Sequence, residues 1–197
     1  MDYEIIKKEI PYQGVFRLVR YQLRFRKFDG TMSKPVVREI FERRACVSVL
    51  LYDPERDQVV LVEQFRPGVM TSHDSPWLLE VVAGIIDEGE SPTQTLIREA
   101  KEEANCDVLD LEPIYRYFSS PGGSNELMEI FCGRITTANK GIYGLAHEQE
   151  DIRTHILSAE EAFAKLKQGE IKTSPAIIAL QWLQLNRERL KTLWLKK

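Results

Sequence analysis

Residues 84–106 crowd six carboxylates around one short helix whose start and end can be read from the sequence. Ser91 is a good N-cap, Pro92 suits the first helical position, and Gln94 completes a Ser-x-x-Gln capping box. Asn105 tolerates the left-handed conformation that ends a helix. An apolar stripe runs between these signals, made of Leu96, Ile97, Ala100 and Ala104. We therefore expect a loop followed by a well-defined helix.

Three of the carboxylates share one face of this predicted helix. Glu99, Glu102 and Glu103 stand at spacings that bring side chains together on a helix surface. Like charges at these spacings repel, and the C-terminal end of a helix also disfavours acids. A solvated acidic face is the plain explanation, and it holds for most acidic helices. A divalent cation would reverse both penalties, and oxygen ligands in this number suit Mg²⁺ or Mn²⁺.

Length and charge narrow the class of protein. The 197 residues allow one domain, or one domain with a small appendage, and the net charge of −3 gives no electrostatic case for binding nucleic acid. We find no signal peptide and no apolar run of membrane-spanning length, so no membrane partner is expected. The three cysteines, Cys46, Cys106 and Cys132, form no Cys-x-x-Cys pair, which favours reduced thiols in a cytoplasmic protein.

The N-terminal part of the chain carries strand patterns. Residues 16–25 alternate apolar and basic side chains, as a strand with one solvated face does, and Asp29-Gly30 signals a hairpin. We therefore expect an N-terminal β-strand region at 1–45, which would form a dimer interface, and a main domain at 46–197.

The rest of the chain mixes strand and helix patterns. Residues 46–52 are a continuous apolar run typical of a buried strand. Further strands are expected at 58–65, 112–118 and 127–135, and further helices from Ser158 and Ser174. The last helix is amphipathic and could lie on a membrane surface, but docking against the sheet is favoured. This order predicts an α/β (α+β) class: a mixed β-sheet sandwiched between helices (α/β/α), with an N-terminal antiparallel β appendage.

The carboxylate-rich stretch resembles the Nudix box, in which glycine, five residues and glutamate are followed by seven residues and Arg-Glu-apolar-x-Glu-Glu-x-Gly-apolar. Asn105 stands where the family usually has glycine, and asparagine can adopt the same left-handed helix end. The positions in register are Gly84, Glu90, Arg98, Glu99, Ala100, Glu102 and Glu103. The resemblance implies the Nudix fold, a loop–helix–loop that carries Mg²⁺, and hydrolysis of a nucleoside diphosphate linked to another group. It also implies structural roles for Gly84, Glu90 and Arg98, with Glu90 and Arg98 bracing the loop.

Residues 119–126 point to one branch of that family. Alone, their Pro-Gly pair is an ordinary turn. Pro121 lies 15 positions beyond Cys106, however, and within Ser-Pro-Gly-Gly it resembles the ADP-ribose diphosphatase branch. Residues 38–66, 76–84, 144–155 and 177–185 resemble the same branch, so the resemblance covers nearly the whole chain. It implies a homodimer that hydrolyses ADP-ribose to AMP and ribose 5-phosphate with Mg²⁺, or with Mn²⁺ as a possible substitute.

The resemblance implies catalytic and metal-binding residues position by position. In the acidic loop 147–153, Glu148 matches the general base, and Glu102 is the alternative proton acceptor. Alone, such a loop is most often merely solvated. The implied metal ligands are the backbone carbonyl of Ala83 and the carboxylates of Glu99, Glu103 and Glu150.

The resemblance also implies substrate contacts. Arg38 and Arg66 would bind the adenine side and the diphosphate, Glu126 the terminal ribose, and Val15 and Phe16 would reach in from the partner subunit. The pocket would be lined by the backbone at Ile85 and by Ser120, Pro121 and Gly122. Arg66 ends an apolar strand, and its guanidinium matches phosphate oxygens, although a surface arginine is the plain alternative. Phe16 could equally be a core residue.

Two other functions fit parts of the same pattern. A GDP-mannose or other nucleotide-sugar diphosphatase would share the Ser-Pro-Gly-Gly turn. A Nudix module that binds ADP-ribose without cleaving it would have no need of the metal ligands, yet all the acidic positions are present.

Overall fold

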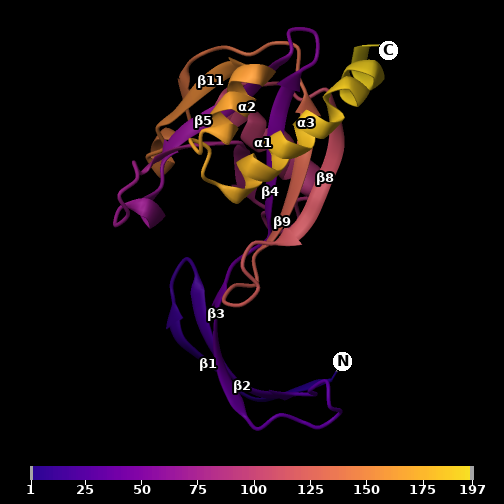
Figure 1. Ribbon diagram of the computed structural model, residues 1–197. Coiled ribbons are helices and arrows are strands. Elements are labelled where there is room, and N and C mark those ends of the chain that lie inside the picture. The colour runs from indigo at the N-terminus through magenta and orange to yellow at the C-terminus, as the bar shows by residue number, and fades with distance from the viewer. Residues whose placement is uncertain (1, 196–197) are drawn as a thin grey trace. The chain divides into compact units, whose positions relative to one another are not determined.

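The computed structural model describes residues 2–195 and divides the chain into two compact units (Figure 1). The first unit runs to Ala45 and also includes Tyr117–Leu127. The second unit consists of Cys46–Arg116 and the described residues from Met128 onward. The sequence patterns give no indication that 117–127 belongs with the N-terminal strands.

The first unit is a three-stranded antiparallel sheet in the order β1-β2-β3. Its strands are β1 (Tyr3–Gln13), β2 (Arg17–Phe25) and β3 (Val36–Glu42). Every residue of β1 is exposed, and Val19 is the one fully buried residue of β2. The strand expected at 16–25 is therefore present, but it belongs to a thin sheet with little core. The segment 117–127 is tied to β3, because Phe41 N donates a hydrogen bond to Gly123 O at 2.8 Å.

The second unit is built on a mixed sheet with the strand order β10-β11-β5-β4-β9-β8. β4 runs parallel to β9 and antiparallel to β5. The strands are β4 (Cys46–Asp53), β5 (Gln58–Phe65), β8 (Asp110–Phe118), β9 (Leu127–Arg134), β10 (Ile142–Tyr143) and β11 (Ile152–Ser158). Four of these lie where the sequence predicts strands, whereas β10 and β11 are additional.

Two short strands fork the sheet between β4 and β5. These are β6 (Trp77–Glu80), which pairs with the far end of β5, and β7 (Val82–Ile85), which pairs with the first half of β4. β4 and β5 pair directly only over Leu51–Asp53 and Gln58–Val60. The chain therefore passes from one branch of the fork to the other between Glu80 and Val82. The candidate site lies at this crossing.

All three α-helices begin where the sequence predicts, and α1 also ends there. α1 (Pro92–Ala104) has the Ser91 capping box and a left-handed C-cap at Asn105, with φ 48° and ψ 38°. α2 (Ala159–Lys167) is capped by Ser158, and α3 (Ser174–Leu195) follows. Two short 3₁₀ helices occupy Pro67–Val69 and Ala146–Glu148. Within residues 2–195, no helix combines the length and the apolar character needed to cross a membrane.

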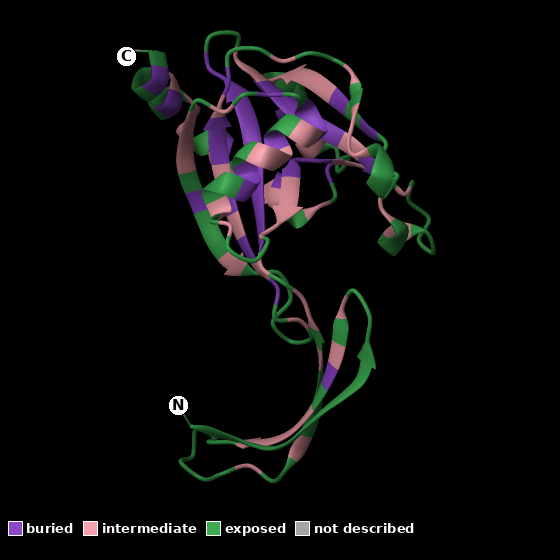
Figure 2. Ribbon diagram, turned by 180° about the vertical axis from the view of Figure 1, so that it is seen from behind, coloured by how far each residue is buried: buried purple, intermediate pink, exposed green. Residues whose placement is uncertain are grey.

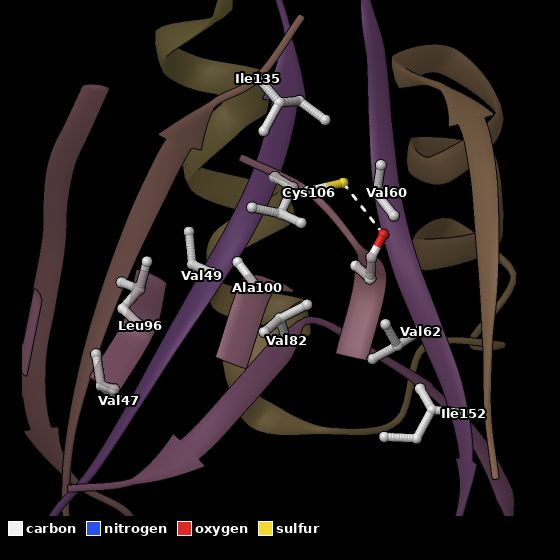
Figure 3. Packing of buried hydrophobic residues seen from close by; sticks show 12 residues of the cluster. Val47, Val49, Val60, Val62, Val82, Leu96, Ala100, Cys106, Ile135 and Ile152 are labelled. Atoms are coloured by element: carbon white, nitrogen blue, oxygen red, sulfur yellow. Dashed lines mark hydrogen bonds between the residues drawn. The ribbon is translucent and has the colours of Figure 1, made fainter. Parts of the chain in front are cut away.

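Helices cover both faces of the central strands (Figure 1). On one face, Val47 and Val49 of β4 join Leu96 and Ala100 of α1 in a single apolar cluster (Figure 3). On the other face, Tyr52 contacts Trp194 of α3, with ring centroids 6.4 Å apart. Figure 2 shows the buried residues gathered in these strands. Burial on both faces explains the uninterrupted apolar run of β4, and the α/β/α prediction is confirmed.

Candidate active site

The last two turns of α1 hold two carboxylates against the backbone of β7. Glu103 is 3% exposed, and its Oε2 accepts a hydrogen bond from Ala83 N at 3.2 Å. Glu99 lies against Gly84 so closely that a Cβ added to Gly84 would stand 2.1 Å from Glu99 Oε1. Any side chain at position 84 would therefore displace the Glu99 carboxylate. The glycine of the motif thus has a steric reason here.

Burial and mutual repulsion act on both carboxyl groups. Burial raises the pKa of Glu103 to about 8, and the charge of Glu99 adds to the shift, while Ala83 N–H and Arg66 oppose it. Burial likewise raises the pKa of Glu99 to about 7, with Arg98 opposing and nearby carboxylates adding. In water these groups would ionise near pH 4.3. The protein therefore holds two acids where their charged forms are disfavoured, as functional sites often do.

Arg98 supplies the positive charge nearest to this pair. Its Nη1 donates to Glu99 Oε1 and to Glu102 Oε2, both at 2.9 Å. Its Nε and Nη2 reach the two oxygens of Glu90, each at 3.3 Å. Glu90 also accepts from Thr95 Oγ1 at 2.6 Å, and Thr95 is fully buried. Arg98 thus ties the loop before α1 to the acidic face of the helix.

A second loop carries the remaining acidic residues. Gly144 N donates to the carbonyl oxygen of Glu102 at 3.1 Å, which joins this loop to the end of α1. Gly144 has φ +106°, and a Cβ there would stand 2.6 Å from Glu150 Cβ. Glu150 Oε2 accepts from Leu145 N at 3.0 Å, so its carboxylate is held by its own loop. Glu148 is exposed, and its side chain lies 3.6 Å from His147.

The chemistry of the paired carboxylates fits a hard divalent cation. Buried Glu103 and half-buried Glu99 offer carboxylate oxygens beside the β7 backbone, and each carboxylate can accept more bonds than the protein supplies. The charge of Glu150 raises the pKa of both, so it also lies near them. Even so, no three acidic, histidine or cysteine side chains within residues 2–195 converge as a complete metal-binding group. The pair is assembled, and Glu150 is held apart by Leu145.

Arg66 follows β5 and lies beside a carboxylate that the sequence analysis missed. Its Nε donates to Glu80 Oε2 at 2.8 Å, and Glu80 is 8% exposed at the end of β6. Burial raises the pKa of Glu80, and Arg66 opposes the shift. In the sequence, Glu80 is the one acidic residue inside the apolar run 77–82. It stands at no recognisable motif spacing from the other acids, so the sequence alone does not mark it as a site residue.

Several expected substrate contacts belong to the first unit. Arg38 is exposed on β3, where its Nη1 donates to Val37 O at 2.8 Å. Glu126 is buried and bonded to Ser119 Oγ at 2.7 Å and to Arg43 Nη1 at 2.8 Å. An exposed turn, closed by a 3.0 Å bond from Gly123 N to Ser120 O, contains Ser120, Pro121 and Gly122.

The two residues expected to reach into a partner's site differ in their surroundings. Val15 is 93% exposed. Phe16 packs on Phe41 with ring centroids 5.0 Å apart, and Arg43 lies over its ring at 5.0 Å. In the second unit, Ile85 is half-buried at the end of β7, opposite Cys46. The structure thus gathers Arg66, Ala83, Glu99 and Glu103 in the second unit, which also carries Ile85, Glu102 and the acidic loop. The expected contacts that belong to the first unit are Val15, Phe16, Arg38, Ser120, Pro121, Gly122 and Glu126.

A family model and curated relatives both match this chain over most of its length. The NUDIX domain matches residues 42–187. The chain is 46% identical to an ADP-ribose pyrophosphatase from Escherichia coli (strain K12) over 194 residues, which cover 98% of this chain and 93% of the relative. It is 42% identical to an ADP-ribose pyrophosphatase from Haemophilus influenzae over 197 residues, which cover 98% of this chain and 91% of the relative.

Matches at lower identity also cover nearly the whole chain. A GDP-mannose pyrophosphatase from Cronobacter sakazakii is 31% identical over 186 residues, covering 94% of this chain and 96% of that relative. A crystal structure described as an ADP compounds hydrolase superposes with a TM-score of 0.73 at 21% identity, covering 98% of this chain and 97% of the other. The superposition agrees with the predicted fold class.

The raised pKa values predict how metal-free stability changes with pH. Glu99 and Glu103 have pKa values of about 7 and 8 when folded, against about 4.3 when unfolded. The folded state therefore binds more protons across this window, and its stability should fall as pH rises from about 4.3 towards 8. Thermal unfolding in EDTA should show a lower midpoint at about pH 8 than at about pH 6.

The matched control is Glu103→Gln, which keeps the shape and removes a titrating group. It should flatten the pH dependence of the midpoint, and Mg²⁺ should raise the wild-type midpoint more than that of the variant. An identical pH slope in wild type and variant would contradict the assigned shift.

Proposed function

The chain belongs to the Nudix family, and from that premise we propose that it is an ADP-ribose diphosphatase, hydrolysing ADP-ribose to AMP and ribose 5-phosphate. The main support is identity over nearly the full length: 46% to an ADP-ribose pyrophosphatase, against 31% to a GDP-mannose pyrophosphatase. The site adds chemical support, because the buried Glu103 and the half-buried Glu99 both lie against the backbone of β7. Such a pair suits metal-assisted attack of water on a diphosphate.

The proposed cofactor is Mg²⁺, with Mn²⁺ as a possible substitute. Its ligands would be the Ala83 carbonyl and the carboxylates of Glu99 and Glu103, joined by Glu150 after a movement of its loop. A bound cation would neutralise diphosphate charge and make water more acidic. The Glu150 carboxylate accepts a hydrogen bond from Leu145 N, and this bond would have to break before the carboxylate could reach the cation. Loops of this kind often close only over substrate.

The protein's own groups would divide the remaining work. Arg66 would bind the diphosphate. The other substrate contacts would be the ones that the family resemblance implies. Glu148 would accept the proton from the attacking water, and its exposure suits a group that must meet a substrate arriving from solvent. Glu102 is the alternative acceptor, but its carboxylate is bonded to Arg98 at 2.9 Å. The guanidinium of Arg98 already occupies one oxygen of the Glu102 carboxylate, whereas Glu148 is exposed, and this difference favours Glu148.

Two other functions remain as alternatives. The GDP-mannose pyrophosphatases cover nearly the whole chain at 31–32% identity, so a nucleotide sugar other than ADP-ribose is the second candidate substrate. A binding module without catalysis is disfavoured, because it would have no reason to bury two mutually repelling carboxylates. Tight ADP-ribose binding with no metal-dependent AMP release would revive it.

We also place the protein in the cytoplasm. Cys46, Cys106 and Cys132 are buried and form no disulfide bond, which agrees with a reducing compartment. Burial raises the pKa of the Cys106 thiol to about 11, so it is a poor nucleophile. Recovery of the protein mainly from an extracellular or periplasmic fraction would contradict this location.

A substrate panel tests the proposed reaction directly. Release of nucleoside monophosphate should be measured for ADP-ribose, GDP-mannose and other nucleotide sugars, with Mg²⁺ and with Mn²⁺. We expect kcat/KM for ADP-ribose to exceed that for GDP-mannose by about tenfold or more, and activity to disappear in EDTA. Faster hydrolysis of GDP-mannose would overturn the choice of substrate and leave the family unchanged.

Substitution of single acids separates the base from the metal ligands. Glu148→Gln should lower kcat by about 10²–10⁴-fold with little change in ADP-ribose affinity, the usual range for a general base. Glu150→Gln should instead weaken the binding of Mg²⁺, so that more Mg²⁺ is needed for activity, and should lower kcat at the same time. If Glu102→Gln shows the large loss and Glu148→Gln does not, the base lies on α1.

We propose a homodimer formed through the first unit. β1 is a long edge strand that exposes five large apolar side chains, and such edges pair readily. These side chains are Tyr3, Ile5, Ile6, Ile10 and Tyr12. Solution scattering at micromolar concentration should give the mass of two chains, and Ile10→Lys should weaken association. The control Glu9→Lys, at an already polar position of β1, should leave the mass unchanged, and a wild-type monomer would contradict the proposal.

A further inference from the structure

Glu80 is a buried carboxylate to which the proposed reaction gives no role. It ends β6 and lies opposite Val62 of β5, in the fork of the sheet. Its side chain is 11% exposed, and burial raises its pKa. Its hydrogen bond is to Arg66, whose Nε donates to Glu80 Oε2 at 2.8 Å. Burying a carboxylate costs free energy unless the carboxylate is paired, and Arg66 is the partner that offsets this cost for Glu80.

The way in which Arg66 is held leaves its two terminal nitrogens available. Glu80 takes Nε, and no other side-chain hydrogen bond of Arg66 is described within residues 2–195. Its backbone is also fixed, because Arg66 N donates to Pro76 O at 2.7 Å. The side chain remains 43% exposed. Nη1 and Nη2 together are the fork that binds a phosphate group through two parallel hydrogen bonds.

The position of Arg66 relates this fork to the paired carboxylates. Arg66 is held by Glu80, which stands three positions before Ala83, and Ala83 N donates to Glu103 Oε2 at 3.2 Å. Arg66 therefore lies at the crossing from β6 to β7, next to the backbone against which the acidic pair packs, and can bind an anion there. An ion pair that served stability alone would gain little from leaving the cation almost half exposed, because solvent screens such pairs. A buried acid that holds a partly exposed arginine instead suits a pair in which Glu80 supports Arg66 and the guanidinium of Arg66 binds a ligand.

We propose that Glu80 is a positioning residue for the diphosphate, an inference that rests on the proposed function. It holds Arg66 through Nε and thereby directs Nη1 and Nη2 to the phosphate oxygens of the substrate. Glu80 does not touch the substrate itself. A neutral glutamine in its place keeps an acceptor for Nε, whereas alanine removes the acceptor and leaves the arginine without its support.

Kinetics and binding of the Glu80 variants test this role. Glu80→Ala should raise KM for ADP-ribose by about 10- to 100-fold, the usual effect of losing a hydrogen bond to a charged group, with a smaller change in kcat. Glu80→Gln should recover most of the loss. The non-hydrolysable α,β-methylene analogue of ADP-ribose, titrated by calorimetry without divalent cation, should show the same order of affinities. A residue that only stabilises the fold would change the unfolding midpoint without separating KM from kcat.

A double-mutant cycle and a matched control make the test decisive. If Glu80 acts through Arg66, adding Glu80→Ala to Arg66→Ala should cause no further rise in KM. Glu63→Ala is the control, because Glu63 lies on β5, the strand paired with β6, and is likewise an acid paired with cationic side chains: Arg153 at 3.6 Å and His155 at 3.0 Å. It should leave KM and analogue affinity unchanged.

The outcomes separate this inference from the proposed function. Additive losses in the double mutant, or unchanged analogue affinity in Glu80→Ala, would overturn the inference while wild-type hydrolysis upheld the reaction. If wild type hydrolyses another nucleoside diphosphate instead, the same cycle with that substrate tests Glu80. Absence of both turnover and analogue binding in wild type would overturn the reaction and the inference together.

Discussion

Two carboxylates that repel each other, one buried and one half-buried, are held against the backbone of β7, and the other charged groups of the site are arranged around that pair. Glu99 and Glu103 could spread into water if the end of α1 were free. It is not free, because Leu96 and Ala100 belong to the main apolar cluster and stand seven and three positions before Glu103, on the same buried side of the helix. The stability of the core therefore holds the acids in place against their charge. Stabilising apolar contacts and destabilising carboxylates thus meet on one side of a single helix, a conflict typical of a functional site.

Two arginines complete this charge arrangement, and each is restrained by an acid of its own. Arg98 is bonded to Glu90 in the loop before α1, and Arg66 to Glu80 at the end of β6. Each cation lowers the pKa of one of the paired acids: Arg98 acts on Glu99, and Arg66 acts on Glu103. Neither arginine neutralises the pair, because both pKa values remain raised. In the metal-free protein, protonation therefore relieves the repulsion, and once both acids ionise an added cation would offset their charge.

The sequence predicts those parts of the structure that local rules control. The capping box of Ser91, the left-handed Asn105 and the buried strand at 46–52 depend on neighbouring residues, and all three are confirmed. The fork of the sheet is not predictable in this way. It depends on whether β5 pairs with β4 or with β6, which no short pattern decides. Glu80 escapes the sequence patterns for the same reason, since its partner Arg66 stands fourteen positions earlier, just after the strand that pairs with β6.

The strand order has a consequence for how the chain acquires its acidic site during synthesis. β5 must wait for β11, and β4 for β9, before either has its full set of neighbours. Such long-range pairings form late and slowly. Until then, α1 has no completed sheet to press against, and we expect its carboxylates to stay hydrated and to repel each other only weakly. The electrostatic strain would then arise late in folding. A nascent or truncated chain that ends before β11 would carry the whole motif yet lack the burial that raises the pKa values of its acids.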